Sequence, residues 1–291
     1  MSMKLAHLIL AHKDPAMLER LVKRLHHKDA DIFIQLDSKT DITPFTHIAD
    51  IPNTYFITNR GDIGYCNYST ISVTLKAMEE ILSLKNDYSH INLISGQDYP
   101  LKPIETIQQH FFANADKSFM HTASIGEGEW PDGVQRFKKY NLGDWKIPGK
   151  YTLQKIANRI LPDRKIPGGL KPYGRSQWMT ITPAAAQYTI DYIKSHPEIE
   201  NYFKYIFAVD EVFFQTILGN SPLKDQSFNY NLRYIVLDPG LRPINYTMAD
   251  AEGLTATNAF FARKFERAVS IEVMDYLDTI IDAPVKNEPK K

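Results

Sequence analysis

The sequence predicts an α/β protein built on a doubly wound, mostly parallel sheet with helices on both faces. Two observations carry this prediction. Short apolar runs of strand length alternate with segments of helical periodicity, and the strand-length runs end in polar residues. Strands that alternate with helices in this way form parallel sheets covered by helices on both sides.

The first strand and helix are the clearest elements. Residues 5–11 form an apolar run broken only by His7, which is typical of a buried strand. Residues 15–25 then show apolar side chains at helical spacing. Asp14 and Pro15 fit the N-cap and first helical position of that helix.

The remaining elements follow from the same patterns. Further strands are predicted at 31–36, 55–58, 88–95, 177–181 and 232–237, and helices at 69–84, 103–112, 153–160, 182–194, 210–218 and 268–281. We expect one domain over residues 1–282, with a nucleotide-binding half at 1–125 and an acceptor and catalytic half at 126–282. Residues 283–291, rich in proline and lysine, are expected to form a flexible tail.

Composition narrows the function classes. The 34 Lys and Arg residues balance 34 Asp and Glu residues, so no global field favours nucleic acid or anionic lipid, and any anion site must be built locally. The single cysteine, Cys66, fits a reducing compartment, and we expect a cytoplasmic protein. No apolar stretch approaches the ~18 residues of a membrane span.

Polar residues at strand ends predict the place of a ligand site. His12, Asp37, Arg60 and Asp98 each lie just beyond a predicted strand. Because ligands of doubly wound sheets bind beyond the carboxyl ends of the strands, these residues should meet at one edge. Asp37 would suit contact with a nucleoside, or it could cap the turn that follows it.

Charged residues in the second half are candidates for chemistry. Asp210 and Glu211 begin a predicted helix, with Asp210 as N-cap and Glu211 in the first turn, where the helix dipole keeps a carboxylate ionised. Both could equally be simple helix caps. Arg263 and Lys264 lie among aromatic residues, and Arg242 precedes a proline. Such cations need an anionic partner, which is either a diphosphate or a structural carboxylate.

The middle of the chain predicts an acceptor region. Residues 126–150 carry Trp130, Arg136 and Trp145, and residues 138–171 are basic, contain proline and show little periodicity. We expect a long excursion over the acceptor side of the cleft. Asp29-Ala30-Asp31 has the spelling of a metal-binding Asp-x-Asp motif, but it precedes its strand, on the wrong edge for a donor metal. No Cys/His cluster has zinc-ligand spacing.

Several motifs follow one another over roughly residues 5–266. They are His7-Leu-Ile-Leu-Ala-His12, Ile34-Gln-Leu-Asp37, Tyr68-Ser69, Ile91-Asn-Leu-Ile-Ser-Gly-Gln-Asp98-Tyr-Pro-Leu-Lys102, Ser176-Gln-Trp178, Asp210-Glu-Val-Phe-Phe-Gln-Thr-Ile-Leu-Gly-Asn-Ser221, Asn231-Leu-Arg-Tyr234 and Phe261-Ala-Arg-Lys-Phe265. Together and in this order they resemble glycosyltransferase family 14, which includes core-2/I-branching β-1,6-N-acetylglucosaminyltransferases and peptide O-xylosyltransferases. Within that family the chain is most similar in type to bacterial stand-alone members.

The resemblance implies a GT-A fold without the metal-binding Asp-x-Asp. It implies that Glu211 is the catalytic base and that Lys264 contacts the donor diphosphate, with Arg242 at about the spacing of its arginine partner. The same comparison implies that His12 and Asp37 lie near the nucleoside. The xylosyltransferases carry an acid where this chain has Gln177, so a base of their type is impossible here and the weight shifts to Glu211.

The implied function is an inverting, metal-independent transfer of a sugar, GlcNAc-like or xylose-like, from a UDP-sugar to a glycan hydroxyl. The UDP-sugar is a co-substrate, and no cofactor is expected. Trp130, Arg136, Trp145 and Trp178 are candidates for acceptor contacts. The expected partners are a nucleotide sugar and a glycan, not nucleic acid, and a lipid-linked acceptor would bring peripheral membrane association. A non-catalytic glycan-binding or nucleotide-sugar-binding relative, or a nucleotide-sugar hydrolase, are the alternatives.

Overall fold

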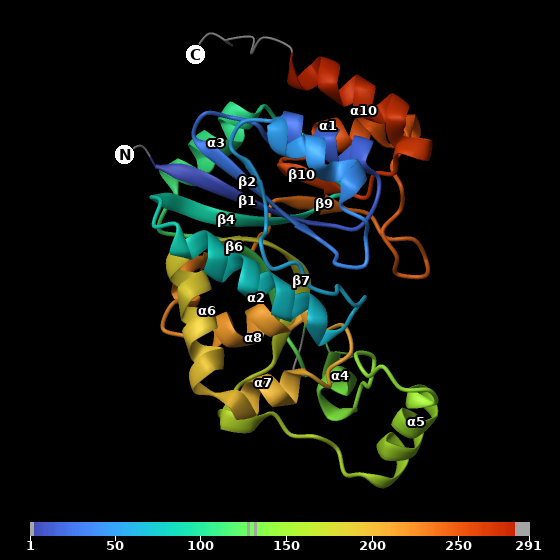
Figure 1. Ribbon diagram of the computed structural model, residues 1–291. Coiled ribbons are helices and arrows are strands. Elements are labelled where there is room, and N and C mark those ends of the chain that lie inside the picture. The colour runs from blue at the N-terminus through green and yellow to red at the C-terminus, as the bar shows by residue number, and fades with distance from the viewer. Residues whose placement is uncertain (1–2, 127–128, 131–132, 283–291) are drawn as a thin grey trace.

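The computed structural model describes residues 3–126, 129–130 and 133–282, so the predicted tail lies outside the described residues. Its main feature is a seven-stranded sheet flanked by helices on both faces (Figure 1). The strands lie in the order β3 (Thr54–Phe56), β2 (Ala30–Leu36), β1 (Lys4–Ala11), β4 (Tyr88–Ser95), β7 (Tyr173–Ile181), β6 (Ser118–Ser124) and β8 (Ser227–Phe228).

The sheet is mostly parallel, as the sequence predicted. Strands β3, β2, β1 and β4 run parallel to one another, and β6 runs parallel to β8. Strand β7 runs antiparallel to both of its neighbours. The end of β6 and the start of β7 therefore lie at the same edge as the carboxyl ends of β1, β2 and β4.

The two faces of the sheet bury alternate side chains of each strand. In β1, Leu5 and Ile9 pack with helices α1 (Pro15–Leu25) and α3 (Ile104–Ala113). Ala6, Leu8 and Leu10 face the opposite core. That core contains helices α2 (Tyr68–Ser83), α6 (Pro183–Ser195), α7 (Pro197–Phe203) and α8 (Phe213–Gly219). Each fully buried Leu or Ile contributes roughly 1.5–3 kcal/mol by leaving water.

A smaller sheet lies beside the large one and was not predicted as a separate unit. It consists of β5 (Asp98–Pro100), β10 (Phe261–Arg263) and β9 (Arg233–Ile235). The short helix α9 (Ala251–Ala256) precedes β10, and the last helix, α10 (Arg267–Ile281), runs beside α1 (Figure 1). Arg20 of α1 donates to Asp278 of α10 at 2.7 Å, which ties the C-terminal helix to the body.

The predicted excursion is present. Helices α4 (Val134–Lys138) and α5 (Lys150–Ile160) lie at the periphery in Figure 1, joined to the rest by irregular chain. We refer to residues 138–171 as the arm. The arm leaves the body after α4 and returns at the start of β7.

Two sequence predictions were wrong in detail. The predicted helix at 210–218 begins only at Phe213 with Val212 at its N-cap, so Asp210 is not an N-cap. Asp210 and Glu211 lie instead in the preceding 3-10 turn Val209–Glu211, which Ala208 enters in the left-handed conformation with φ of 50°. Strand β6 was also missed, because its mixed run Ser118–Ser124 carries no clear alternation.

Candidate active site

The residues singled out from the sequence gather at one edge of the large sheet. His12 follows β1, Asp37 follows β2, and Gly96 follows β4. Trp130 lies shortly beyond β6, and its backbone N–H donates to the carbonyl of Ser124 at 3.2 Å. The parallel register of β1, β2 and β4 brings their ends together, so the sequence prediction of a shared edge is confirmed.

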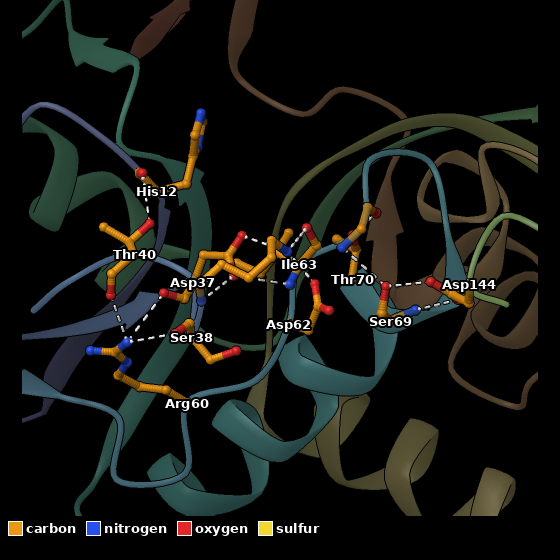
Figure 2. A network of polar contacts seen from close by, with 12 residues as sticks. His12, Asp37, Ser38, Thr40, Arg60, Asp62, Ile63, Ser69, Thr70 and Asp144 are labelled. Carbon is orange, nitrogen blue, oxygen red and sulfur yellow. Dashed lines mark hydrogen bonds and ion pairs between the residues drawn. The ribbon is translucent and has the colours of Figure 1, made fainter. Parts of the chain in front are cut away.

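Arg60 organises the loop beyond β2 (Figure 2). Its guanidinium donates to the backbone carbonyls of Asp37, Ser38 and Thr40 at 3.3, 3.2 and 2.9 Å. The Thr40 hydroxyl in turn donates to the carbonyl of His12 at 2.9 Å. Arg60 thus satisfies three carbonyls of a tight turn and fixes its shape.

The carboxylate of Asp37 is buried under this loop. It accepts from the backbone N–H groups of Lys39 at 3.0 Å and Ile63 at 3.4 Å, and Lys39 Nζ lies 3.0 Å from it. Asp37 therefore caps its turn, which is one of the two roles that the sequence predicted for it. The carboxylate still lies at the carboxyl end of β2, where a nucleoside would bind.

His12 lies among the charges of the site. Burial, Lys13 and the nearby Lys264 and Arg263 lower its pKa, while Asp37 opposes them. The imidazole is accordingly neutral near pH 7. These electrostatic neighbours come from opposite ends of the chain, so β1, β2 and β10 bring them to a single place.

Arg263 and Asp98 form a buried ion pair. The guanidinium donates to Asp98 Oδ1 at 2.9 Å and lies 4.5 Å from the ring centre of Trp178. Burial raises the pKa of Asp98, while Arg263 and the N–H of Ser95 act in the opposite direction. The sequence left open whether Arg263 has a structural carboxylate as its partner, and Asp98 is that carboxylate. The ring of Trp178, itself buried, packs against the face of this guanidinium.

Lys264 shares an anion with a second lysine. Glu266 lies 3.0 Å from Lys264 Nζ, accepts from Lys13 Nζ at 2.8 Å and accepts from the Gln97 amide at 3.0 Å. Lys13 and Lys264 lower the pKa of Glu266 to about 2. A cavity of about 90 Å³ is lined in part by Lys13, Gly96, Gln97 and Glu266. Sequence reasoning missed Lys13, although its position next to His12 was a signal.

Arg242 is mostly exposed and pairs with Asp238 at 3.0 Å. Two residues further on, the carbonyl of Ile244 accepts from the backbone N–H of Lys264 at 3.2 Å. The loop that carries Arg242 therefore runs next to Lys264. The arginine side chain lies at the surface and is 78% exposed.

Glu211 pairs with Arg136 at the other end of the site. Arg136 donates to Glu211 Oε2 at 2.5 Å, and its guanidinium lies 4.6 Å from the ring centre of Trp130. The Glu211 side chain is 39% exposed, so its carboxylate is open to solvent. Arg136 binds Oε2, and Oε1 has no hydrogen-bond partner among the described residues.

Asp210 lies beside this pair in a different environment. Its Oδ1 is inaccessible and has no hydrogen-bond partner within the described residues. Burial, followed by the charge of Glu211, raises the pKa of Asp210 to about 6. Two adjacent carboxylates thus differ sharply: one is exposed and paired, and the other is enclosed.

Strand β7 connects the two ends of the site. Gly174, near its start, packs against the carbonyl of Glu211, where any side chain would clash at 2.7 Å. Trp178, four residues on, lies under Arg263. An irregularity in the pairing with β6 falls between these two points, where Arg175 and Met179 of β7 face Thr122 and Met120. Gln177 lies between Gly174 and Trp178, half-buried, and its amide cannot accept a proton.

The root of the arm is attached to the first half of the chain. Asp144 accepts from the backbone N–H of Ser69 at 3.0 Å and from its hydroxyl at 2.7 Å (Figure 2). Lys146 lies 3.2 Å from Asp62. Trp145, between these two residues in the sequence, is 40% exposed.

The described part of the chain has no cluster of side chains suited to a metal ion. Across residues 3–126, 129–130 and 133–282, no three His, Cys, Asp or Glu side chains are grouped closely enough to hold a metal ion. Asp31 of the rejected Asp-x-Asp spelling pairs with Lys4 at 2.8 Å, at the opposite edge of the sheet. Nor does any described helix have the length and apolar character needed to cross a membrane.

The fold and the site define an α/β protein with a carboxylate–arginine pair beside the start of β7 and two lysines around Glu266, just beyond the ends of β1 and β10. Residues 5–253 match the family described as "Branch: Core-2/I-Branching enzyme". The chain belongs to this family, and the resemblance drawn from its motifs is confirmed.

Similar curated proteins are xylosyltransferases. A xylosyltransferase of Ciona intestinalis is 23% identical over 289 residues, covering 90% of this chain and 32% of that protein. Xylosyltransferase 2 of Rattus norvegicus is 24% identical over 310 residues, covering 94% and 33%. Xylosyltransferase 1 of Homo sapiens is 24% identical over 301 residues, covering 94% of this chain and 30% of that protein. The chain spans about a third of the length of these relatives.

Among solved structures, the crystal structure of S. aureus TarS 1-349 covers 98% of this chain and 67% of its own, with a TM-score of 0.41 and 11% identity. A similarity this loose supports no statement about function.

Proposed function

We propose that this protein is an inverting, metal-independent glycosyltransferase that moves a sugar from a UDP-sugar to a glycan hydroxyl. The observation that carries the proposal is the arrangement along β7. Glu211, whose side chain is 39% exposed, packs its backbone against Gly174 at the start of the strand, and Arg263, followed by Lys264, lies over Trp178 further along it. Family membership supports the same reaction class.

In the proposed reaction, the acceptor hydroxyl attacks the anomeric carbon opposite the leaving diphosphate, which inverts that carbon. Glu211 Oε1 accepts the hydroxyl proton, a contribution typically worth ~10²–10⁴ in rate. Arg136 holds the carboxylate in place through Oε2 and is itself fixed by stacking on Trp130. The base is therefore oriented before the substrate arrives.

The departing UDP carries the developing negative charge. Lys264 is the proposed main contact with the diphosphate, with Arg242 able to reach it from the adjacent loop. Fixed cations stabilise such charge in place of a metal ion. Asp37 and His12 lie at the strand ends where the nucleoside would bind. Arg60 holds the loop beyond β2 in position, and Asp98 holds Arg263.

The donor sugar is proposed to be GlcNAc-like or xylose-like. The named xylosyltransferase relatives favour testing UDP-xylose. The family resemblance implies that Gln177 stands where the xylosyltransferases carry an acid, which favours Glu211 as the base. Trp130, Arg136 and Trp145 are the proposed acceptor contacts. The buried Trp178 acts by supporting Arg263.

The test is Glu211→Gln, with Asp210→Asn as the neighbouring control. A thermal-shift screen of nucleotide sugars first identifies the donor, because a ligand that binds the folded state raises the melting temperature. Glu211→Gln should still bind that donor and lose ~10² or more in transfer rate. Asp210→Asn should keep transfer within a few-fold.

An active Glu211→Gln variant together with an inactive Asp210→Asn variant would contradict the proposal and would show that Asp210, not Glu211, is the base. Donor hydrolysis that no glycan acceptor accelerates would instead make the protein a nucleotide-sugar hydrolase.

A further inference from the structure

Helix α5 exposes its apolar side to solvent. None of its residues is buried, and Figure 1 shows it at the outer end of the arm, away from both sheets. Leu153, Ile156 and Ile160 are 42%, 51% and 71% exposed. At ~100° per residue, these three side chains fall within about 60° of one another around the helix axis. They form a continuous apolar stripe, which we call the α5 stripe.

The polar side of the same helix faces the protein. Gln154 Oε1 accepts from the backbone N–H of Leu142 at 2.8 Å. Asn158 accepts from the N–H of Tyr140 at 2.7 Å and donates to its carbonyl at 2.8 Å. These bonds fix the rotation of α5 about its axis. The α5 stripe is therefore held outward by specific hydrogen bonds, and the usual orientation of an amphipathic helix on a protein core is reversed.

The arm is also strongly basic. Residues 138–171 contain nine Lys and Arg residues and two Asp residues, so their formal net charge is +7 in a chain whose total is zero. Arg159 and Lys155 lie about 60° and about 100° around the α5 axis from Ile156. Both are exposed and form no ion pair within the described residues. Charge is thus concentrated where the apolar side chains are exposed.

The combination of an apolar stripe with nearby cations limits which partners could bind to the exposed side of α5. A second copy of this chain would bring its own basic arm, and the like charges would repel. An anionic bilayer accommodates both features: the acyl boundary takes up apolar side chains, and the lipid headgroups attract Lys and Arg. This is the chemistry of helices that lie in the membrane interface.

We propose that α5 docks on an anionic membrane surface. The α5 stripe inserts at the level of the headgroups and acyl chains, and Lys155 and Arg159 contact the anionic headgroups. The arm begins two residues after Arg136 and returns to β7 beside Glu211, so docking would place the bilayer next to the candidate acceptor region. This proposal concerns a surface of the arm and does not depend on the reaction proposed above.

The test uses the full 291-residue chain and vesicle flotation. The protein should float with vesicles of equimolar phosphatidylglycerol and phosphatidylcholine, and little with phosphatidylcholine alone. Raising the salt concentration should weaken binding, because the headgroup attraction is screened. The double variant Ile156→Asp, Ile160→Asp should bind at least about tenfold more weakly, and so should Lys155→Glu, Arg159→Glu.

The matched control is Ile271→Asp, Ile280→Asp on α10, two isoleucines that are each 40% exposed. This variant should bind like the unchanged protein. Since α5 contributes no buried residue, the melting temperatures of the α5 variants should stay close to that of the parent, and this confirms that they fold.

Three results would overturn the proposal. They are failure of the unchanged protein to float with anionic vesicles, equal binding to neutral and anionic vesicles, and binding that survives the α5 substitutions. Concentration-dependent dimerisation in sedimentation that the Ile156→Asp, Ile160→Asp variant abolishes would also overturn it, by assigning the stripe to a second copy.

Discussion

Lys264 and Glu266 form an ion pair of 3.0 Å, so the lysine proposed to bind the donor diphosphate already has an anion beside it. Lys13 lies 2.8 Å from the same carboxylate oxygen, Oε1. In the proposed reaction, the diphosphate takes up the Lys264 ammonium while Glu266 stays bound to Lys13. Glu266 keeps Lys264 in place before the donor binds.

Lys264→Ala should weaken UDP binding far more than uridine binding. A charge-assisted phosphate contact is worth roughly 1.5–3 kcal/mol, and competition from Glu266 favours the lower end, about tenfold in affinity. Calorimetric titration of both ligands measures the difference. Lys194→Ala, a surface lysine paired with Glu79, serves as the control and should change neither affinity. Equal losses for UDP and uridine would mean that Lys264 is structural.

Transfer activity should survive chelation. The proposed site neutralises the diphosphate with Lys264 and Arg242, so excess EDTA should leave the rate unchanged within experimental scatter. The measurement is turnover with and without EDTA, followed by addition of manganese. Complete loss of turnover that manganese restores would contradict the metal-independent mechanism.

Asp210 should make the stability of the protein depend on pH between about 4 and 6. Burial raises its pKa to about 6 in the folded state, against ~3.9 in an unfolded chain. Between these values the folded state binds the extra proton, so the free energy of unfolding falls as pH rises through this window. Above both pKa values Asp210 is charged in the folded and the unfolded state, and the folded protein bears the full free-energy cost of burying the charged carboxylate.

Asp210→Asn removes this titration. The difference in unfolding free energy between the parent and Asp210→Asn should therefore move in favour of the parent as pH falls from 7 to 4. Urea denaturation at several pH values measures it. Parallel pH curves for the two proteins would show that Asp210 is solvated like an ordinary aspartate.

Breaking the pair of Asp98 and Arg263 should be costly. The two side chains are 1% and 17% exposed, and Asp98→Ala would leave a mostly buried guanidinium without its carboxylate. We expect a loss of about 3 kcal/mol in the free energy of unfolding. Glu79→Ala, in an exposed pair with Lys194, should cost less than ~1 kcal/mol. Similar small losses for both variants, in urea denaturation, would argue against a structural role for Asp98.

Local patterns in the sequence were sufficient for much of the first half of the fold. The apolar run at 5–11 is β1 almost to the residue, and the Asp14–Pro15 start of α1 is present, with Asp14 accepting from Met17 N–H at 3.1 Å. These elements are set by contacts within a few residues or by complete burial, and both leave a readable pattern. The shared edge of His12 and Asp37 followed because parallel strands end together.

Only the tertiary structure decided the partners of the charged residues. Nothing near Arg263 in the sequence indicates Asp98, and nothing near Glu211 indicates Arg136, because these pairs join segments 165 and 75 residues apart. The sequence placed Asp210 at a helix cap, whereas the left-handed Ala208 turns it inward and Glu211 outward. A sequence pattern reports which residues can carry charge, but burial and neighbours decide what each charge does, and those depend on the packing of distant segments.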